Sequence, residues 1–316
     1  MKKISILFLM VSFFLISVSG LASQDYPTQP IRIVIPFNPG GGSDILTRAV
    51  DKYIDLEQPR VLIYIPGASG LVGAMEVLKA KPDGYTLLAH NANNIVSQYL
   101  SGATDIMLWR ELEVICDLVM DHTIVNTNKY TGWTTFEEVI DFARKNPGKV
   151  KWGVTGARSL AAVDMLMIQE ATGLQFQMVP YDGGAATRAA LLGGHIDVEI
   201  TTVSDARAVI ESGDAIPLVV LDETRSPFFP EVPTLRELGY DVLAFQPRSY
   251  YAPPGTPETI INKLAAAFEK VSRNEDFIKE MNELYYVVKF RGPKEAFQVA
   301  EDMYNDWKPI FDKYLR

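Results

Sequence analysis

The sequence PFNPGGGSDILTR, residues 36–48, joins two patterns that together decide the fold. Just before it, the β-branched run IRIVIPF (residues 31–37) predicts a buried strand. Over residues 44–56, apolar side chains return at the three- and four-residue spacing of an amphipathic helix. A strand, a glycine-rich turn and a helix in this order predict a βα unit whose helix begins near Asp44.

The turn between them predicts an anion site. Helix N-termini carry unpaired N–H groups and about half a positive charge, and glycines let the backbone approach a ligand closely. Because α/β sheets bind ligands at the carboxyl ends of their strands, Gly40, Gly41, Gly42 and Ser43 are expected to supply backbone donors. The alternative is a tight turn with Ser43 or Asp44 as the N-cap residue, and the two interpretations are compatible.

A nucleotide phosphate fits this turn poorly. A Walker loop ends in Gly-Lys-Ser/Thr, which does not follow Gly42, and the dinucleotide fingerprint fails because Ile45 stands where its last glycine belongs. Asp44 would also repel a doubly charged phosphate more than a carboxylate.

Strand and helix patterns alternate along the rest of the chain. Further strands are expected at residues 60–65, 85–90, 151–154, 176–181, 196–203 and 215–221. Helices are expected at residues 70–81 and 161–172, after Thr134 or Thr135 as N-cap, after Gly183 and Gly184, and over most of the last seventy residues. The fold class is therefore α/β with parallel βαβ units.

The N-terminus predicts a secreted protein. Lys2 and Lys3 precede an apolar stretch at residues 4–18, and small residues follow, which is the layout of a signal peptide at residues 1–22 that is cleaved near Ala22. We therefore expect a periplasmic protein. The remaining chain of about 290 residues exceeds one ordinary domain and predicts two.

Composition excludes several classes of protein. The formal net charge is −9 and no basic stripe is visible, so nucleic-acid binding is disfavoured. The only cysteine, Cys116, lies in the apolar run LEVICDLVM and is expected to be a buried small hydrophobe. One cysteine cannot form an internal disulfide.

A second strand–turn–helix pattern, GVTGARSLAAVDML at residues 153–166, is another candidate ligand loop. Its candidate residues are Thr155, Gly156, Ala157, Arg158 and Ser159. Arginine offers a planar fork that suits a carboxylate, although a surface arginine is an equal alternative.

Two further glycine-rich turns are ambiguous. In YDGGAATRAALLGG, Asp182 and Thr187 either contact a ligand or cap the helix. For IPGASGLVGA, residues 65–74, close packing of a turn is the favoured interpretation.

Catalysis and metal binding find little support. The histidines at 90, 122 and 195 share no spacing with a nucleophile or with each other, and neither Gly-x-Ser-x-Gly nor His-Glu-x-x-His occurs. Each histidine is expected to be a satisfied structural residue. No metal-ligand cluster is present in the sequence pattern, so we expect no enzyme, no metal and no cofactor.

Six motifs in order carry a resemblance that covers nearly the whole mature chain. They are YPTQPIRIVIPFNPGGGSD, PGASGLVGA, KPDGYTLL, YDGGAATRAALLGGHIDV, FPEVPTLRELG and APPGTP. The chain resembles the extracytoplasmic solute-binding proteins of the tripartite tricarboxylate transporter family, also called the Bug family.

The resemblance implies a two-lobed Venus-flytrap fold, similar to type II periplasmic binding proteins, with a ligand cleft between the lobes. It implies lobe 1 at residues 23–125 plus 246–316, lobe 2 at 126–245, and crossings near 125 and 245. A ligand carboxylate would be held by the loop from Phe37 through Pro39 to Asp44 and by the loop from Thr155 to Ser159. The solute, a di- or tricarboxylate or related organic acid, would pass to two membrane permease subunits, and the protein would act as a monomer.

The sequence departs from the family pattern at the second loop. Many relatives have Gly-x-Gly-Ser-x-x-His there, whereas Arg158 replaces the second glycine and Ala162 the histidine, and Pro247 stands where tryptophan is frequent. Arg158 is expected to shift the preference toward a more anionic ligand, such as a dicarboxylate. The alternatives to transport are a ligand-presenting partner of a membrane sensor kinase and, less favoured, a periplasmic enzyme acting on a carboxylate.

Overall fold

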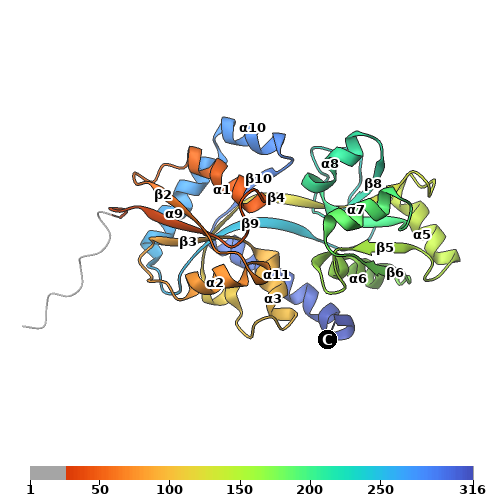
Figure 1. Ribbon diagram of the computed structural model, residues 1–316, viewed down its shortest axis with the longest axis horizontal. Coiled ribbons are helices and arrows are strands. Elements are labelled where there is room, and N and C mark those ends of the chain that lie inside the picture. The colour runs from red at the N-terminus through yellow and green to blue at the C-terminus, as the bar shows by residue number, and fades with distance from the viewer. Residues whose placement is uncertain (1–25, 316) are drawn as a thin grey trace, which may run out of the picture.

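The computed structural model describes residues 26–315, which form two α/β lobes joined by two strands (Figure 1). The predicted signal peptide, residues 1–22, lies outside the described residues. The first lobe contains β1 (Ile31–Ile35), α1 (Gly42–Tyr53), β2 (Arg60–Tyr64), the 3-10 turn η1 (Ala68–Gly70), α2 (Leu71–Leu78), β3 (Thr86–Asn91), α3 (Ala92–Leu100) and α4 (Leu108–Glu111), and later α9 (Glu258–Ser272), α10 (Glu275–Glu283), β10 (Val287–Arg291) and α11 (Pro293–Ile310). The second contains α5 (Phe136–Lys145), β5 (Lys151–Val154), α6 (Leu160–Thr172), β6 (Gln177–Pro180), α7 (Gly184–Leu192), β7 (Val198–Thr202), α8 (Val203–Glu211) and β8 (Ala215–Val220).

The joining strands are β4 (Glu113–Asn128) and β9 (Phe245–Ala252), which run side by side between the lobes in Figure 1. β4 pairs with β9 as far as His122, and from Thr123 onward it pairs with β7 and β8 of the second lobe. This exchange of partners lies close to residue 125, and β9 begins at 245, the two points where crossings were expected. The domain boundaries themselves stay a prediction.

Each lobe contains the parallel strands that the alternation predicted. β1 pairs in parallel with β2 and β3, and β5 pairs in parallel with β6 and β7. Ile31, Ile33 and Ile35 of β1 pack into the core beneath α1, whereas Val34 points to the opposite face and joins a second core. Burial of Val34 on the face opposite Ile33 and Ile35 explains why the strand ends in three consecutive β-branched residues.

Two helix starts differ in outcome. Thr135 caps α5 through a capping box with Glu138, as expected for one of the two alternatives. The expectation that Ser43 or Asp44 caps α1 is wrong, because the extended residue Gly41 is the N-cap and the helix already begins at Gly42. The glycines continue into the helix, so Ser43 and Asp44 lie within its first turn.

The C-terminal region is mostly helical, as expected, but it also contains one strand that was not predicted. β10 pairs antiparallel with β4, where Val287 lies opposite Met120. Its five residues lie between two helices, and so short a strand carries little periodic signal. After α11 the chain ends in the π-helical turn η2 (Phe311–Leu315), which Figure 1 shows beside the second lobe.

Cys116 is fully buried on β4, which confirms its expected place in a core. Among residues 26–315, every helix is too short or too polar to cross a membrane.

Candidate ligand-binding cleft

A cleft of about 810 Å³ lies between the lobes. The first lobe contributes Phe37, Ala68, Ser69, Asn94, Ser97, Gln98, Ser101 and Ala103. The second lobe contributes Thr155, Arg158, Ser159, Leu160, Ala161, Asp164, Gly184, Ile200, Thr201, Thr202 and Asp205, and the joining strands add Thr123 and Gln246. Its volume lies within the usual range for small-molecule sites, roughly 300–1,000 Å³.

The second lobe presents three helix starts to this cleft. Leu160 and Ala161 begin α6, Gly184 begins α7, and Thr202 is the N-cap of α8. The first turns of these helices hold backbone N–H groups without helical partners, which attract an anion.

The expected loop at 155–159 lies largely in the cleft wall. Thr155, Arg158 and Ser159 line it, while Ala157 is exposed to solvent. Gly156 turns the chain with φ 137°, a conformation that other residues rarely adopt. Ser159 is the N-cap of α6, and its hydroxyl accepts from the Ala162 N–H at 3.3 Å.

Arg158 is also engaged outside the cleft. Its Nε donates to the carbonyl oxygen of Leu315 at 2.8 Å, and its Nη2 donates to the same oxygen. The guanidinium therefore ties the C-terminal turn to the second lobe, while its side chain still lines the cleft.

In the first glycine loop, Phe37 lines the cleft, whereas Pro39, Gly40, Gly41, Gly42, Ser43 and Asp44 do not belong to its lining. The backbone of Gly42 lies against the side chains of Arg248 and Tyr286, and a Cβ there would stand 2.7 Å from the Tyr286 hydroxyl. Within residues 26–315, the N–H groups of Gly42 and Ser43 make no hydrogen bond, so they remain free donors next to this arginine.

Asp44 organises the same loop. Its carboxylate accepts from the Gly40 N–H at 2.7 Å, from the Tyr64 hydroxyl at 2.7 Å and from Arg48 Nε at 2.8 Å. Burial acts to raise the pKa of Asp44, but these hydrogen bonds outweigh it and hold the pKa below its ordinary value. The Asp44 carboxylate is thus ionised and hydrogen-bonded through both oxygens. The Gly40 N–H donates to it and is therefore not available to a ligand.

The third candidate turn reaches the cleft with a residue other than the two that were predicted. Asp182 is exposed, and buried Thr187 donates to the Gly183 carbonyl at 3.1 Å. Neither residue is part of the cleft lining, to which this turn contributes Gly184.

Sequence reasoning missed several parts of the cleft, including residues of α3 and the start of α8. The turn PGASG was interpreted as packing, yet Ala68 and Ser69 line the cleft with positive φ angles of 46° and 54°. Such angles are strained for residues with a side chain and occur often at ligand sites. The recurrence of the strand–glycine turn–helix pattern was the available signal.

A further omission is Asp164, one turn into α6. It is 6% exposed and lines the cleft, and burial raises its pKa to about 8. Within the described part of the chain, no side chain or backbone group makes a hydrogen bond or ion pair with it.

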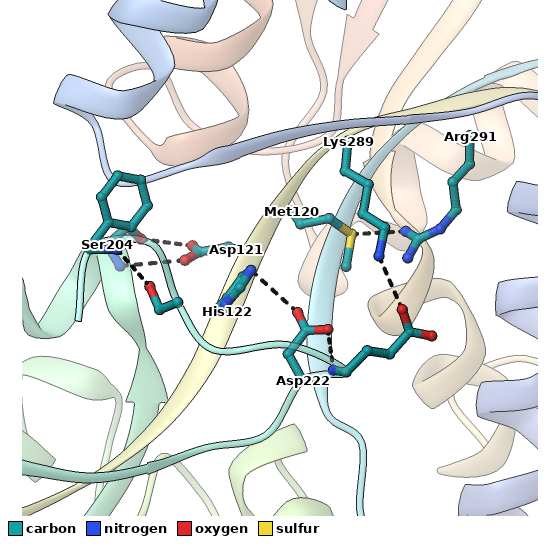
Figure 2. A network of polar contacts seen from close by, with 10 residues as sticks. Met120, Asp121, His122, Ser204, Asp222, Lys289 and Arg291 are labelled. Carbon is teal, nitrogen blue, oxygen red and sulfur yellow. Dashed lines mark hydrogen bonds and ion pairs between the residues drawn. The ribbon is translucent and has the colours of Figure 1, made fainter. Parts of the chain in front are cut away.

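Polar residues also connect the lobes along β4 (Figure 2). On β4, Asp121 accepts from the Ser204 hydroxyl at 2.7 Å and lies 3.4 Å from Arg248 Nη2. The neighbouring His122 Nε2 lies 3.4 Å from an oxygen of Asp222. Figure 2 shows the contacts of Asp121 with Ser204 and of His122 with Asp222 along β4, at the point where the strand exchanges its partners.

The histidines are only partly satisfied. His90 accepts from the Asn91 N–H through Nδ1, but its Nε2 is buried without a partner among residues 26–315, as is Nδ1 of His122. The expectation of fully satisfied histidines is therefore wrong for these two. Over the same residues, no group of three or more His, Cys, Asp or Glu could hold a metal ion.

Residues 47–315 match the profile of the family described as tripartite tricarboxylate transporter family receptor. The chain belongs to this family. The receptor is 32% identical to the protein BugT of Bordetella pertussis over 256 residues, which cover 78% of each chain.

Solved structures agree with this assignment. A ligand-free TctC solute-binding protein from Polaromonas superposes on the receptor with a TM-score of 0.83 at 27% identity, over 92% of this chain and all of the other. MatC from Rhodopseudomonas palustris, solved with bound malate, shares the fold with a TM-score of 0.71 at 22% identity, over 90% of this chain and 100% of its own. The predicted family and two-lobed fold are confirmed.

Proposed function

We propose that this receptor captures a small carboxylate in the cleft and delivers it to the membrane permease of a tripartite tricarboxylate-type transporter. The observation that carries the proposal is the convergence of α6, α7 and α8, whose N-terminal residues line one cleft. Their partial positive charge favours a carboxylate although the whole protein is acidic. Malate in the related fold of MatC supports this class of ligand.

Closure of the lobes is the mechanism, and no bond of the ligand is made or broken. The ligand would contact the second lobe through the starts of α6 and α8 and the first through Ser69, Asn94 and Gln98. A ligand favours the closed state only as far as it binds that state better than the open one. β4 and β9, the strands that join the lobes, would carry the motion. The closed form would then be the one that the permease recognises.

The experiment is a thermal-shift screen of purified mature protein with mono-, di- and tricarboxylates and acidic amino acids. A true ligand at a hundredfold excess over its dissociation constant raises stability by about 2.7 kcal/mol. Absence of a shift with every carboxylate would contradict the proposed binding. Uptake of the identified ligand by membrane vesicles carrying the permease, with and without the receptor, tests the delivery step.

Arg158 is proposed to strengthen the grip on the carboxylate. Arg158 lines the cleft, and a charge-assisted hydrogen bond from its guanidinium to the ligand would contribute about 1.5–3 kcal/mol, or roughly ten- to hundredfold in affinity. Arg158→Ala tests this by titration of the identified ligand. Unchanged affinity would leave Arg158 with only its contact to Leu315.

A further inference from the structure

Asp164 is a buried carboxyl that the fold of the receptor does not use. Helix α6 begins at Leu160, so Asp164 lies beyond the first turn of the helix. Acidic side chains cap a helix or interact favourably with its dipole within that first turn, so Asp164 does neither. Its neighbours Val163 and Met165 are buried in the core. Among residues 26–315 it has no hydrogen-bond or ion-pair partner, and its side chain lines the cleft.

An unpartnered buried carboxyl is unfavourable in the empty receptor. Removing an ionised group from water costs several kcal/mol unless a partner compensates. The raised pKa of about 8 expresses this cost, since the group stays protonated near pH 7. A donor on the ligand would remove the cost when it binds.

The charges around the cleft indicate which donor fits. Three ionisable side chains line it: Arg158, Asp164 and Asp205. Arg158 already donates to Leu315, and Asp205 is an exposed first-turn residue of α8. An ammonium group beside Asp164 would favour its carboxylate form, and two carboxylates facing one guanidinium then suit a ligand with a positive group better than a ligand with a second negative group.

The placement of Asp164 also fits a ligand with both kinds of charge. Leu160 and Asp164 are four residues apart and share a face of α6, about 6 Å along the helix axis. Side chains on a helix lean toward its N-terminus. A ligand whose carboxylate meets the start of α6 can therefore extend a positive group to Asp164.

We propose that Asp164 is a specificity-determining residue that binds an ammonium group, so that the ligand is an amino-acid-like zwitterion rather than a plain dicarboxylate. The inference rests on the proposed function, because it assumes that the same cleft holds the ligand carboxylate. It reverses the preference for a more anionic ligand that Arg158 alone suggested.

Matched pairs of probes test the inference by isothermal titration. Glutamate and γ-aminobutyrate each carry an ammonium group, at the α-carbon or at the chain end, and glutarate carries none. The receptor is expected to bind one of the two amino acids about tenfold or more tightly than glutarate. Asp164→Asn should weaken that amino acid about tenfold or more and leave glutarate within about twofold. Asp141→Asn, an exposed change on α5, is the matched control and should alter neither.

Proton release provides a readout that a structural role would not give. At pH 7 an incoming ammonium group should displace the proton from Asp164, so the binding enthalpy should depend on the ionisation enthalpy of the buffer. This dependence should vanish in Asp164→Asn, whose folding is checked by thermal melting.

The outcomes separate the inference from the proposed function. Tighter binding of glutarate than of both amino acids, or equal weakening of all probes by Asp164→Asn, would overturn the role of Asp164 and leave carboxylate capture intact. If glutarate, both amino acids and every acid in the wider screen fail to bind, both the role of Asp164 and the proposed capture of a carboxylate are overturned.

Discussion

The Ser204 hydroxyl donates to Asp121 at 2.7 Å. This hydrogen bond joins the first turn of α8 in the second lobe to β4, the strand that comes from the first lobe. Asp121 is fully buried, and burial raises its pKa to about 6 although Arg248 and Ser204 act to lower it. The hydrogen bond therefore stabilises an ionised group at the joint between the lobes.

Ser204→Ala should destabilise the protein because it leaves one oxygen of a buried carboxylate without its hydroxyl donor. The loss is expected to be about 1–3 kcal/mol at pH 7.5, where Asp121 is ionised. Urea unfolding measures it, with Ser212→Ala as a control, since that exposed hydroxyl contacts only its own turn and Asp214. Equal effects of the two variants would show that the bond between the lobes contributes nothing.

Asp44→Asn should loosen the first glycine loop. The carboxylate accepts hydrogen bonds from Gly40, Tyr64 and Arg48. We therefore expect the free energy of unfolding to fall by about 1–3 kcal/mol at pH 7. Because the folded pKa of Asp44 is depressed, this contribution is present above the ordinary pKa of an aspartate and is lost as pH falls through the folded value.

Unfolding at pH 7 and at pH 3 measures the prediction for Asp44. The difference between wild type and Asp44→Asn should shrink at the lower pH. Asp55→Asn, a change at a mostly exposed carboxylate in the same lobe, should show no such trend. A constant difference would assign the effect to packing rather than to charge.

The glycine loops show how far the sequence alone could go. The β1–α1 unit and the position of residues 155–159 at a helix start follow from local periodicity and helix-start chemistry, which depend only on neighbours in the chain. The contact of Gly42 with Arg248 and Tyr286 could not be foreseen, because residues more than 200 positions apart meet there. For the same reason Arg158 was interpreted without Leu315, and Asp164 was missed because its significance lies in the absence of a partner.

His90 should make stability fall in mild acid. Burial, aided by Arg248, lowers its pKa to about 3. Between pH 6.5 and 3 the unfolded chain therefore binds a proton at His90 that the folded protein does not bind. The free energy of unfolding decreases as pH falls through this range. The contribution lost between pH 7 and pH 4 is about 3 kcal/mol, from 1.36 kcal/mol per pKa unit.

The measurement for His90 compares the pH dependence of urea unfolding in wild type and His90→Asn. The variant should show a shallower decline between pH 7 and pH 4 than wild type does. His195→Asn, at an exposed histidine, should keep the wild-type slope. Parallel curves for wild type and His90→Asn would contradict the burial of a neutral imidazole.

Asp164→Asn should stabilise the ligand-free receptor, the opposite of its expected effect on binding. With a folded pKa of about 8, the carboxyl of Asp164 binds its proton more tightly in the folded than in the unfolded state. Stability is therefore lost as pH rises from about 4 to about 8, and at pH 7 the loss approaches about 4 kcal/mol. The amide cannot ionise, so the advantage of the variant should grow with pH over this window and level off above pH 8.

Thermal melting from pH 4 to pH 9 measures the difference in stability between wild type and Asp164→Asn. Asp141→Asn is the control, and its curve should follow wild type. A variant no more stable than wild type at pH 8 would show that Asp164 already has a partner.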